Sequence, residues 1–234
     1  MDYAEGGDLG DYLMKQNGRL LDEELTCDWF VQMTSALRYI HEKNILHIDL
    51  KPMNVFLTGS GTIKLGDFGI AKVLKCTADM ARTRIGTLVY MAPEVMGVEP
   101  YGHKTDMWSL SEDSPRTSGA DPGQVRYMPQ VVGGGGNMSR WVRCHRTLLV
   151  YVESWPPDEK YRYSAELRGL VGELLQKDPH ARPSTDTVLR RPLIWYKAQT
   201  RKLAPAEEAR RMAEAIVEEL RHDMAAQEKE AVRE

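Results

Sequence analysis

One long helical segment constrains the fold of this chain more than any other feature. Residues 22–43 carry large apolar side chains at steps of three and four residues: Trp29, Phe30, Met33, Leu37 and Ile40. That spacing is typical of a helix with one buried face. Asp22 is suited to cap the start of the helix and Asn44 to end it. We therefore predict an amphipathic helix over residues 22–43.

Two short runs rich in β-branched and aromatic residues follow this helix. They cover residues 54–57 and 62–65, and the sequence between them is Thr-Gly-Ser-Gly. This composition is typical of two strands joined by a tight turn. The fold class that we expect is mainly α with a small β-hairpin.

The next part of the chain loses its apolar periodicity. Between residues 111 and 146 the sequence is rich in Ser, Pro and Asp, and it contains four consecutive glycines at residues 133–136. Such a stretch is typical of a loop or of disorder. Order is expected to resume at residues 148–152. A second core helix is predicted from the apolar residues Leu167, Leu170, Val171, Leu174 and Leu175, with its end at Asp178-Pro179.

The last segment, residues 196–234, has a different composition. From Pro205 onward it is rich in Ala, Glu, Arg and Lys, and an apolar stripe includes Ile216 and Leu220. We expect a long charged helix here. The stripe is too short to distinguish a helix packed on the domain from the start of a coiled coil, which would bind a partner helix. Both readings stay open.

Four polar residues have the chemistry that phosphoryl transfer requires. Asp49 can accept or orient a hydroxyl proton, and Lys51 can neutralise charge on a transferring phosphoryl group. Asn54 and Asp67 offer oxygen ligands suited to Mg²⁺. Because Asn54 is expected to start the first hairpin strand and Asp67 to end the second, both should lie at the same edge of the hairpin.

The motifs around these residues identify a family. Residues 47–54 read His-Ile-Asp-Leu-Lys-Pro-Met-Asn and residues 67–69 read Asp-Phe-Gly. They resemble the catalytic loop and the metal-binding motif of protein kinases. Further matches follow in the family's order: Gly86-Thr87, Ala92-Pro93-Glu94, Asp106-Met107-Trp108 and Arg182. The chain is thus similar to a serine/threonine kinase domain over residues 1–195.

Three segments are similar to the NIMA-related kinases in particular: residues 1–9, 54–57 and 81–87. The resemblance implies ATP and Mg²⁺ as cofactors and protein substrates with Ser or Thr acceptors. It implies that the backbone of Asp2 and Ala4 binds adenine, that Asp8 lies near the ribose and that Phe56 floors the pocket.

The same resemblance gives roles to the remaining motif residues. Thr87 would face the substrate, and Thr83 would be the phosphorylation site of the activation loop. His47 would be a buried structural residue, and Glu94 would pair with Arg182. Asp106 would open the central helix of the large lobe.

Three departures from the family pattern limit these expectations. The chain starts at the position of the hinge, so we expect a large lobe without the amino-terminal lobe, and weak or no activity from the isolated chain. Ile48 replaces the arginine that would pair with a phosphorylated loop. The apolar helix breaks after Leu110, and we hypothesise that residues 111–146 reflect alternative splicing or a gene-model error.

Bulk composition excludes several other classes of protein. The formal net charge is −3, so there is no global positive field to attract nucleic acid or an anionic membrane. The cysteines Cys27, Cys76 and Cys144 are far apart, which argues against disulfides and zinc. No apolar run is long enough to cross a bilayer. We expect a cytoplasmic protein, and the resemblance adds an association with the cytoskeleton or a cilium.

Two functions of different classes therefore remain. The first is a protein serine/threonine kinase. The alternative is a catalytically inactive kinase lobe that acts as a protein-interaction module, with a coiled-coil scaffold as a third reading.

Overall fold

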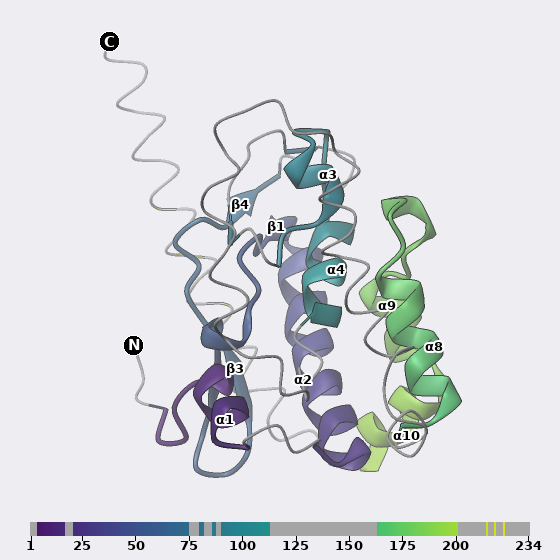
Figure 1. The fold of residues 1–234 in the computed structure, drawn as a ribbon. Coiled ribbons are helices and arrows are strands. Elements are labelled where there is room, and N and C mark those ends of the chain that lie inside the picture. Colours follow the sequence, from purple (N-terminus) through teal and green to yellow (C-terminus); the bar gives the residue numbers. More distant parts are fainter. Residues whose placement is uncertain are drawn as a thin grey trace.

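The computed structural model describes residues 4–16, 21–74, 80–81, 86–87, 90–112 and 163–200, together with residues 214, 218 and 222. The described part is mostly helical and carries two small antiparallel sheets (Figure 1). Most of the expected insert, residues 113–146, lies outside the described residues, and so does the apolar run at 148–152.

The predicted central helix is confirmed as α2, Glu23–Glu42. The Asp22 carboxylate accepts a hydrogen bond from the Glu24 amide at 3.3 Å and so caps the first turn. Asn44, with a φ of 58°, adopts the left-handed conformation that ends many helices. All the apolar residues that predicted the helix are buried. Figure 1 shows α2 in the middle of the fold.

The predicted hairpin is also confirmed. Strand β2, Val55–Leu57, pairs antiparallel with β3, Ile63–Leu65, and Phe56 lies opposite Lys64. The Ile63 amide donates to the Gln32 side-chain oxygen at 2.8 Å, which attaches the hairpin to α2. The short helix α1, Leu9–Lys15, packs beside β2. These contacts bury one side of the hairpin between α1 and α2.

A second sheet was not predicted. It pairs β1, Ile45–Leu46, with β4, Lys72–Val73, in antiparallel register. Each strand has only two residues, which is too short for a sequence pattern to show. This pairing holds the two ends of residues 45–73 together, so the loop and hairpin between them form one closed unit.

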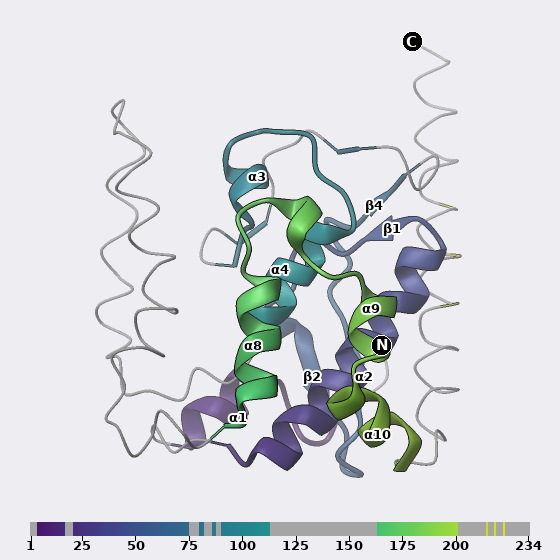
Figure 2. The same ribbon diagram turned by 90° about the vertical axis from the view of Figure 1, so that its right-hand side faces the viewer.

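The remaining helices surround α2. Helices α3, Pro93–Met96, and α4, Lys104–Glu112, follow the hairpin in sequence. The predicted second core helix is α8, Ala165–Leu174. After it come the 3₁₀ turn η3, Pro179–Ala181, and the helices α9, Thr185–Leu189, and α10, Pro192–Thr200. Figure 2 shows α8 beside α4 and α9 against α2, as the contacts between these elements require.

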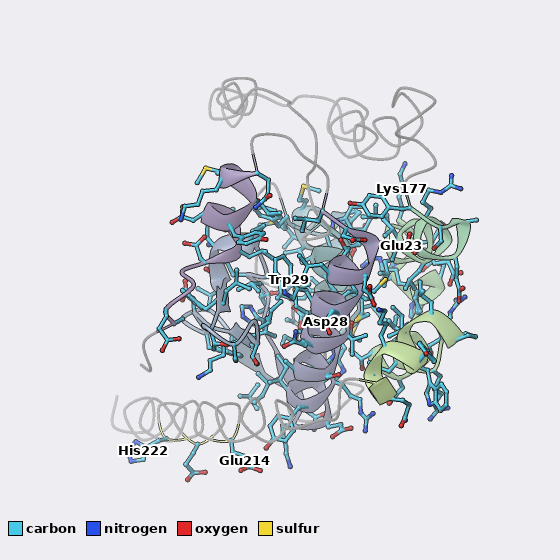
Figure 3. All side chains as sticks on the ribbon, turned by 90° about the horizontal axis from the view of Figure 1, so that it is seen from below. Glu23, Asp28, Trp29, Lys177, Glu214 and His222 are labelled. Atoms are coloured by element: carbon cyan, nitrogen blue, oxygen red, sulfur yellow. The ribbon has the colours of Figure 1, made fainter. Side chains whose placement is uncertain are left out.

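Side chains of α2 reach both neighbouring layers. Trp29 packs edge-to-face on Tyr12 of α1, with the ring centroids 5.1 Å apart. The Glu23 carboxylate accepts the Ser164 amide at 2.6 Å at the start of α8. Figure 3 shows Glu23 on the side of α2 that faces the green helices. Helix α2 therefore contacts α1, the hairpin and the start of α8.

The expected boundary after residue 195 falls inside α10, which continues to Thr200. Beyond it, Glu214, Glu218 and His222 are helical and exposed; Figure 3 labels the first and the last. Their spacing of four places them on one polar face of a helix. The rest of the tail lies outside the described residues, and its packing stays a prediction. Within the described ranges, no helix is long and apolar enough to cross a membrane.

Candidate active site

The loop that carries Asp49 runs between β1 and the 3₁₀ turn η1, Pro52–Asn54. Hydrogen bonds to Asp106, in the first turn of α4, hold this loop in place. One Asp106 oxygen accepts the Ile48 amide at 2.8 Å, and the other accepts the His47 amide at 3.0 Å. Asp106 is fully buried, so these charge-assisted bonds fix the loop backbone.

The Asp49 carboxylate is the centre of the site. Its Oδ1 accepts both the backbone amide of Thr87 at 2.9 Å and the Thr87 hydroxyl at 2.6 Å. Its Oδ2 contacts Lys51 Nζ at 2.5 Å and accepts Asn54 Nδ2 at 3.2 Å. Lys51 Nζ also donates to the Thr87 hydroxyl at 3.0 Å. Asp49, Lys51, Asn54 and Thr87, the residues expected to take part in catalysis, thus form one hydrogen-bonded cluster.

The electrostatics of the cluster keep Asp49 ionised. Burial raises the pKa of Asp49, but the hydrogen bonds from Lys51 and Thr87 and the positive charge of Lys51 lower it more. The pKa therefore lies below the ordinary value for aspartate. A carboxylate of this kind orients a hydroxyl in the ground state and takes its proton late, when the hydroxyl oxygen has lost electron density.

The two expected metal ligands do lie at one end of the hairpin, although not as strand residues. Asn54 closes η1 instead of starting β2, because Pro52 favours a helical turn at this point. Asp67 lies two residues beyond the end of β3. The Gly66 amide donates to the Asn54 carbonyl at 2.9 Å, which extends the ladder and brings the two residues near each other.

The donor set of these two residues fits Mg²⁺. Asn54 uses its Nδ2 to donate to the Asp49 carbonyl at 2.8 Å, which leaves its amide oxygen as a ligand. Asp67 is exposed and has a φ of 54°, and its Oδ1 accepts a long bond, 3.3 Å, from the Gly69 amide. Among the described residues no group of three His, Cys, Asp or Glu side chains could hold a metal. Mg²⁺ commonly needs only one or two protein ligands beside substrate phosphates.

The expected nucleotide residues Asp8 and Phe56 lie beside each other, with Phe56 in strand β2 of the hairpin. Asp8 pairs with Phe56 across a single β-bridge, and its carboxylate accepts the Asp11 amide at 2.9 Å as the N-cap of α1. The Phe56 ring packs so closely on Gly66 that a Cβ there would lie 2.6 Å from the ring. Ala4 accepts the Gly7 amide in a turn at 3.1 Å. Asp2 lies outside the described residues, as does the expected phosphorylation site Thr83.

His47 is placed as a structural residue. It is fully buried, its Nε2 contacts the Gly66 carbonyl at 3.1 Å, and its ring packs on Phe68 with the centroids 4.6 Å apart. Burial lowers the pKa of His47, so the ring is neutral at pH 7. It links the catalytic loop to the end of the hairpin.

The expected ion pair between Glu94 and Arg182 is formed in the structure. Arg182 Nη1 and Nη2 donate to the two Glu94 oxygens at 2.6 and 2.7 Å. Three backbone carbonyls, those of Lys104, Gln176 and Lys177, accept the other guanidinium hydrogens. Both side chains are buried, so this pair joins α3 to the turn that follows α8.

Sequence reasoning missed His41 and His103. The His41 Nε2 lies 2.8 Å from Asp106 Oδ2, and its ring stacks on that of His103 with the centroids 4.5 Å apart. A signal for His41 was present, because it lies four residues after Leu37 on the buried face of α2. No pattern pointed to His103, whose contact depends on the tertiary fold.

Comparison with known proteins places the chain in a family. The model of the protein kinase domain matches residues 1–112. The mouse serine/threonine-protein kinase Nek1 is 40% identical over 197 residues, which cover 83% of this chain and 15% of Nek1. Mouse Nek4 is 41% identical over 196 residues, covering 83% of this chain and 23% of Nek4. Mouse Nek3 is 33% identical over 226 residues, which cover 94% of this chain and 40% of Nek3.

The chain therefore spans 15 to 40% of the length of these relatives. The order of the motifs, the hydrogen bonds around Asp49 and these sequence identities all indicate the same family. The chain belongs to the protein kinase family and, within it, to the Nek serine/threonine kinases.

Proposed function

We propose that this chain transfers the γ-phosphoryl group of ATP to serine or threonine hydroxyls of protein substrates. The observation that carries the proposal is the cluster in which the Asp49 carboxylate contacts Lys51 and accepts the Thr87 hydroxyl. The Thr87 hydroxyl itself shows that an aliphatic alcohol fits within hydrogen-bond reach of this carboxylate, at 2.6 Å.

Each residue of the cluster has a distinct task in this reaction. Asp49 orients the acceptor hydroxyl and receives its proton late in the transfer. An ammonium group has three hydrogens, and the contacts of Lys51 with Asp49 and Thr87 use two of them. The third can reach a phosphoryl oxygen and stabilise its negative charge.

Asn54 and Asp67 would hold Mg²⁺, which neutralises charge on the phosphates of the nucleotide. Asp8 and Phe56, together with the turn at Ala4, would hold the ribose and adenine. This assignment rests on family membership and on the position of these residues around the hairpin.

A transfer assay tests the proposal. The chain is incubated with labelled ATP, Mg²⁺ and generic protein substrates, and the labelled amino acids are identified after hydrolysis. We expect a weak phosphoserine or phosphothreonine signal from the wild-type chain and none above background from Asp49→Asn. Asp186→Asn, the same change at an exposed position on α9, serves as the control and should keep the wild-type signal.

Equal background signal from the wild type and Asp49→Asn would contradict the proposal. That result would favour the alternative, in which the lobe acts as a protein-interaction module without catalysis.

A further inference from the structure

Gly66 lies between the hairpin and Asp67, and both of its backbone hydrogen-bonding groups are engaged. Its amide donates to the Asn54 carbonyl at 2.9 Å, and its carbonyl oxygen lies 3.1 Å from His47 Nε2. Gly66 therefore contacts one expected metal ligand, Asn54, and immediately precedes the other, Asp67. A group that fixes Gly66 also fixes the backbone from which the Asp67 side chain starts.

The Phe56 ring packs on Gly66. Phe56 lies opposite Lys64, so Gly66, two residues further along, is its diagonal neighbour on the same face of the hairpin. A Cβ built on Gly66 would lie 2.6 Å from ring atom Cε2 and 2.9 Å from Cδ2. Because a carbon–carbon bond is about 1.5 Å long, Cε2 lies within about 4.1 Å of the Gly66 Cα itself, which is van der Waals contact. The ring thus fills the space that a side chain at position 66 would need.

The backbone of Phe56 is held on both sides. On one side it pairs with Lys64 of β3, and on the other it forms the bridge with Asp8. Next to this bridge, the Gly7 carbonyl accepts the Leu57 amide at 2.8 Å. The ring can therefore leave Gly66 only by rotation about its side-chain bonds.

Asp67 needs support from its surroundings because its backbone is strained. Its φ is 54°, in the left-handed region that residues other than glycine seldom adopt. The bond that its Oδ1 accepts from the Gly69 amide is 3.3 Å long and so holds the carboxylate weakly. Strained conformations persist where neighbouring groups maintain them, and the contact between Phe56 and Gly66 is next to this one.

We propose that Phe56 is a positioning residue for the metal site: its ring, packed on Gly66, holds the backbone that places Asp67 for Mg²⁺. This inference rests on the proposed function, in which Asn54 and Asp67 hold Mg²⁺ and Phe56 floors the adenine pocket. It gives Phe56 a second task, because the same ring then couples the nucleotide pocket to the metal ligands.

Substitutions at positions 56 and 66 test this packing. Gly66→Ala adds the methyl group that would collide with the ring, and the φ of Gly66 is outside the left-handed region, so the backbone itself tolerates alanine. Phe56→Val removes Cδ2 and Cε2 and keeps a residue suited to a strand. The double variant Phe56→Val/Gly66→Ala removes the collision and puts a methyl group into the space of the ring. Gly172→Ala, in α8 where an added Cβ meets no atom within 4 Å, is the matched control.

The measured quantity is the ratio of the ATP dissociation constants without and with Mg²⁺, from titration calorimetry. Contacts between Phe56 and the adenine enter both constants and cancel in the ratio. Gly66→Ala should lower the ratio about tenfold, the usual effect of losing a group that orients a metal ligand. Phe56→Val should lower it by a smaller factor, the double variant should recover most of the loss, and Gly172→Ala should match the wild type.

Hydrogen exchange of the amide at residue 66 is a second readout that needs neither ATP nor activity. This amide donates to the Asn54 carbonyl, so Gly66→Ala should speed its exchange beyond the intrinsic difference between glycine and alanine. The double variant should slow the exchange again. Amides in the middle of α2 report global opening in every variant.

The inference is overturned if Gly66→Ala keeps the wild-type ratio, or if the double variant is no better than Gly66→Ala. Where Gly66→Ala does not fold, Phe56→Val decides, and a wild-type ratio in that variant overturns the inference. A wild-type chain whose ATP affinity does not respond to Mg²⁺ overturns it as well. Absence of phosphotransfer in a chain that shows the expected ratios would contradict the proposed function only.

Discussion

The buried pair of Glu94 and Arg182 gives a stability prediction whose size follows from the structure. Relative exposure of the two side chains is 3% and 0%. Arg182 Cζ also lies 5.0 Å from the centroid of the Trp108 ring. Glu94→Gln keeps the side-chain shape but leaves the guanidinium buried without its counter-charge.

Removing one partner of a buried ion pair typically costs about 3–5 kcal/mol. Domains of this kind have a total unfolding free energy of about 5–15 kcal/mol, so Glu94→Gln should bring the chain close to unfolding. With a urea dependence of about 2 kcal/mol per molar, the unfolding midpoint should fall by about 1.5–2.5 M.

Urea titration followed by far-UV circular dichroism measures this change, because the described fold is mostly helical. The matched control is Glu173→Gln, which removes the charge from the exposed pair of Glu173 and Arg191, with exposures of 44% and 36%. An exposed pair contributes less than about 1 kcal/mol, so the control midpoint should move by less than about 0.5 M. Equal shifts in the two variants would refute the reasoning.

Three further predictions concern titratable groups. Asp106→Asn should lower phosphotransfer at least about tenfold while ATP affinity changes little, because the carboxylate holds the loop backbone and not the nucleotide; kinetics with separate binding measurements check this. Burial and the charge of His41 lower the pKa of His103 to about 4, with Asp106 opposing, so the unfolded chain binds this proton first as the pH falls. The contribution of His103 to the free energy of unfolding should therefore be fully present above about pH 6.5 and be lost as the pH falls toward 4. Urea titrations should show a smaller loss for His103→Phe. Burial, followed by the charge of Glu23, raises the pKa of Cys27 to about 11, so iodoacetamide at pH 8 should label it only in denaturant, as peptide mass mapping would show.

The parts of the fold that sequence could predict depend on local periodicity. The apolar spacing from Trp29 to Ile40 fixes one face of α2, and the Thr-Gly-Ser-Gly turn sets the hairpin register. The site residues were recognisable because Asp49, Lys51 and Asn54 lie within six residues of sequence and have the types that phosphoryl transfer needs. Local pattern and local chemistry were sufficient for these elements.

The features that could not be predicted depend on contacts between distant segments. The β1–β4 pairing joins two-residue strands that are separated in sequence by the catalytic loop and the hairpin. No periodicity exists over two residues. The contact of His41 with Asp106 spans 65 positions. Ile48 has a positive φ, and its amide donates to Asp106, which lies 58 positions away in sequence. Asn54 ends the 3₁₀ turn η1 and does not start the strand, because Pro52 favours a helical turn where η1 begins.

The most direct test of the central claim measures binding and transfer on one variant. Asp49 is assigned to the acceptor hydroxyl, so Asp49→Asn should lower kcat by at least about a hundredfold, the usual contribution of such a group. The Kd for ATP with Mg²⁺ should stay within about threefold of the wild type, because Asp49 is not assigned to the nucleotide. An unchanged kcat, or a loss of ATP binding that accounts for the whole effect, would contradict the account.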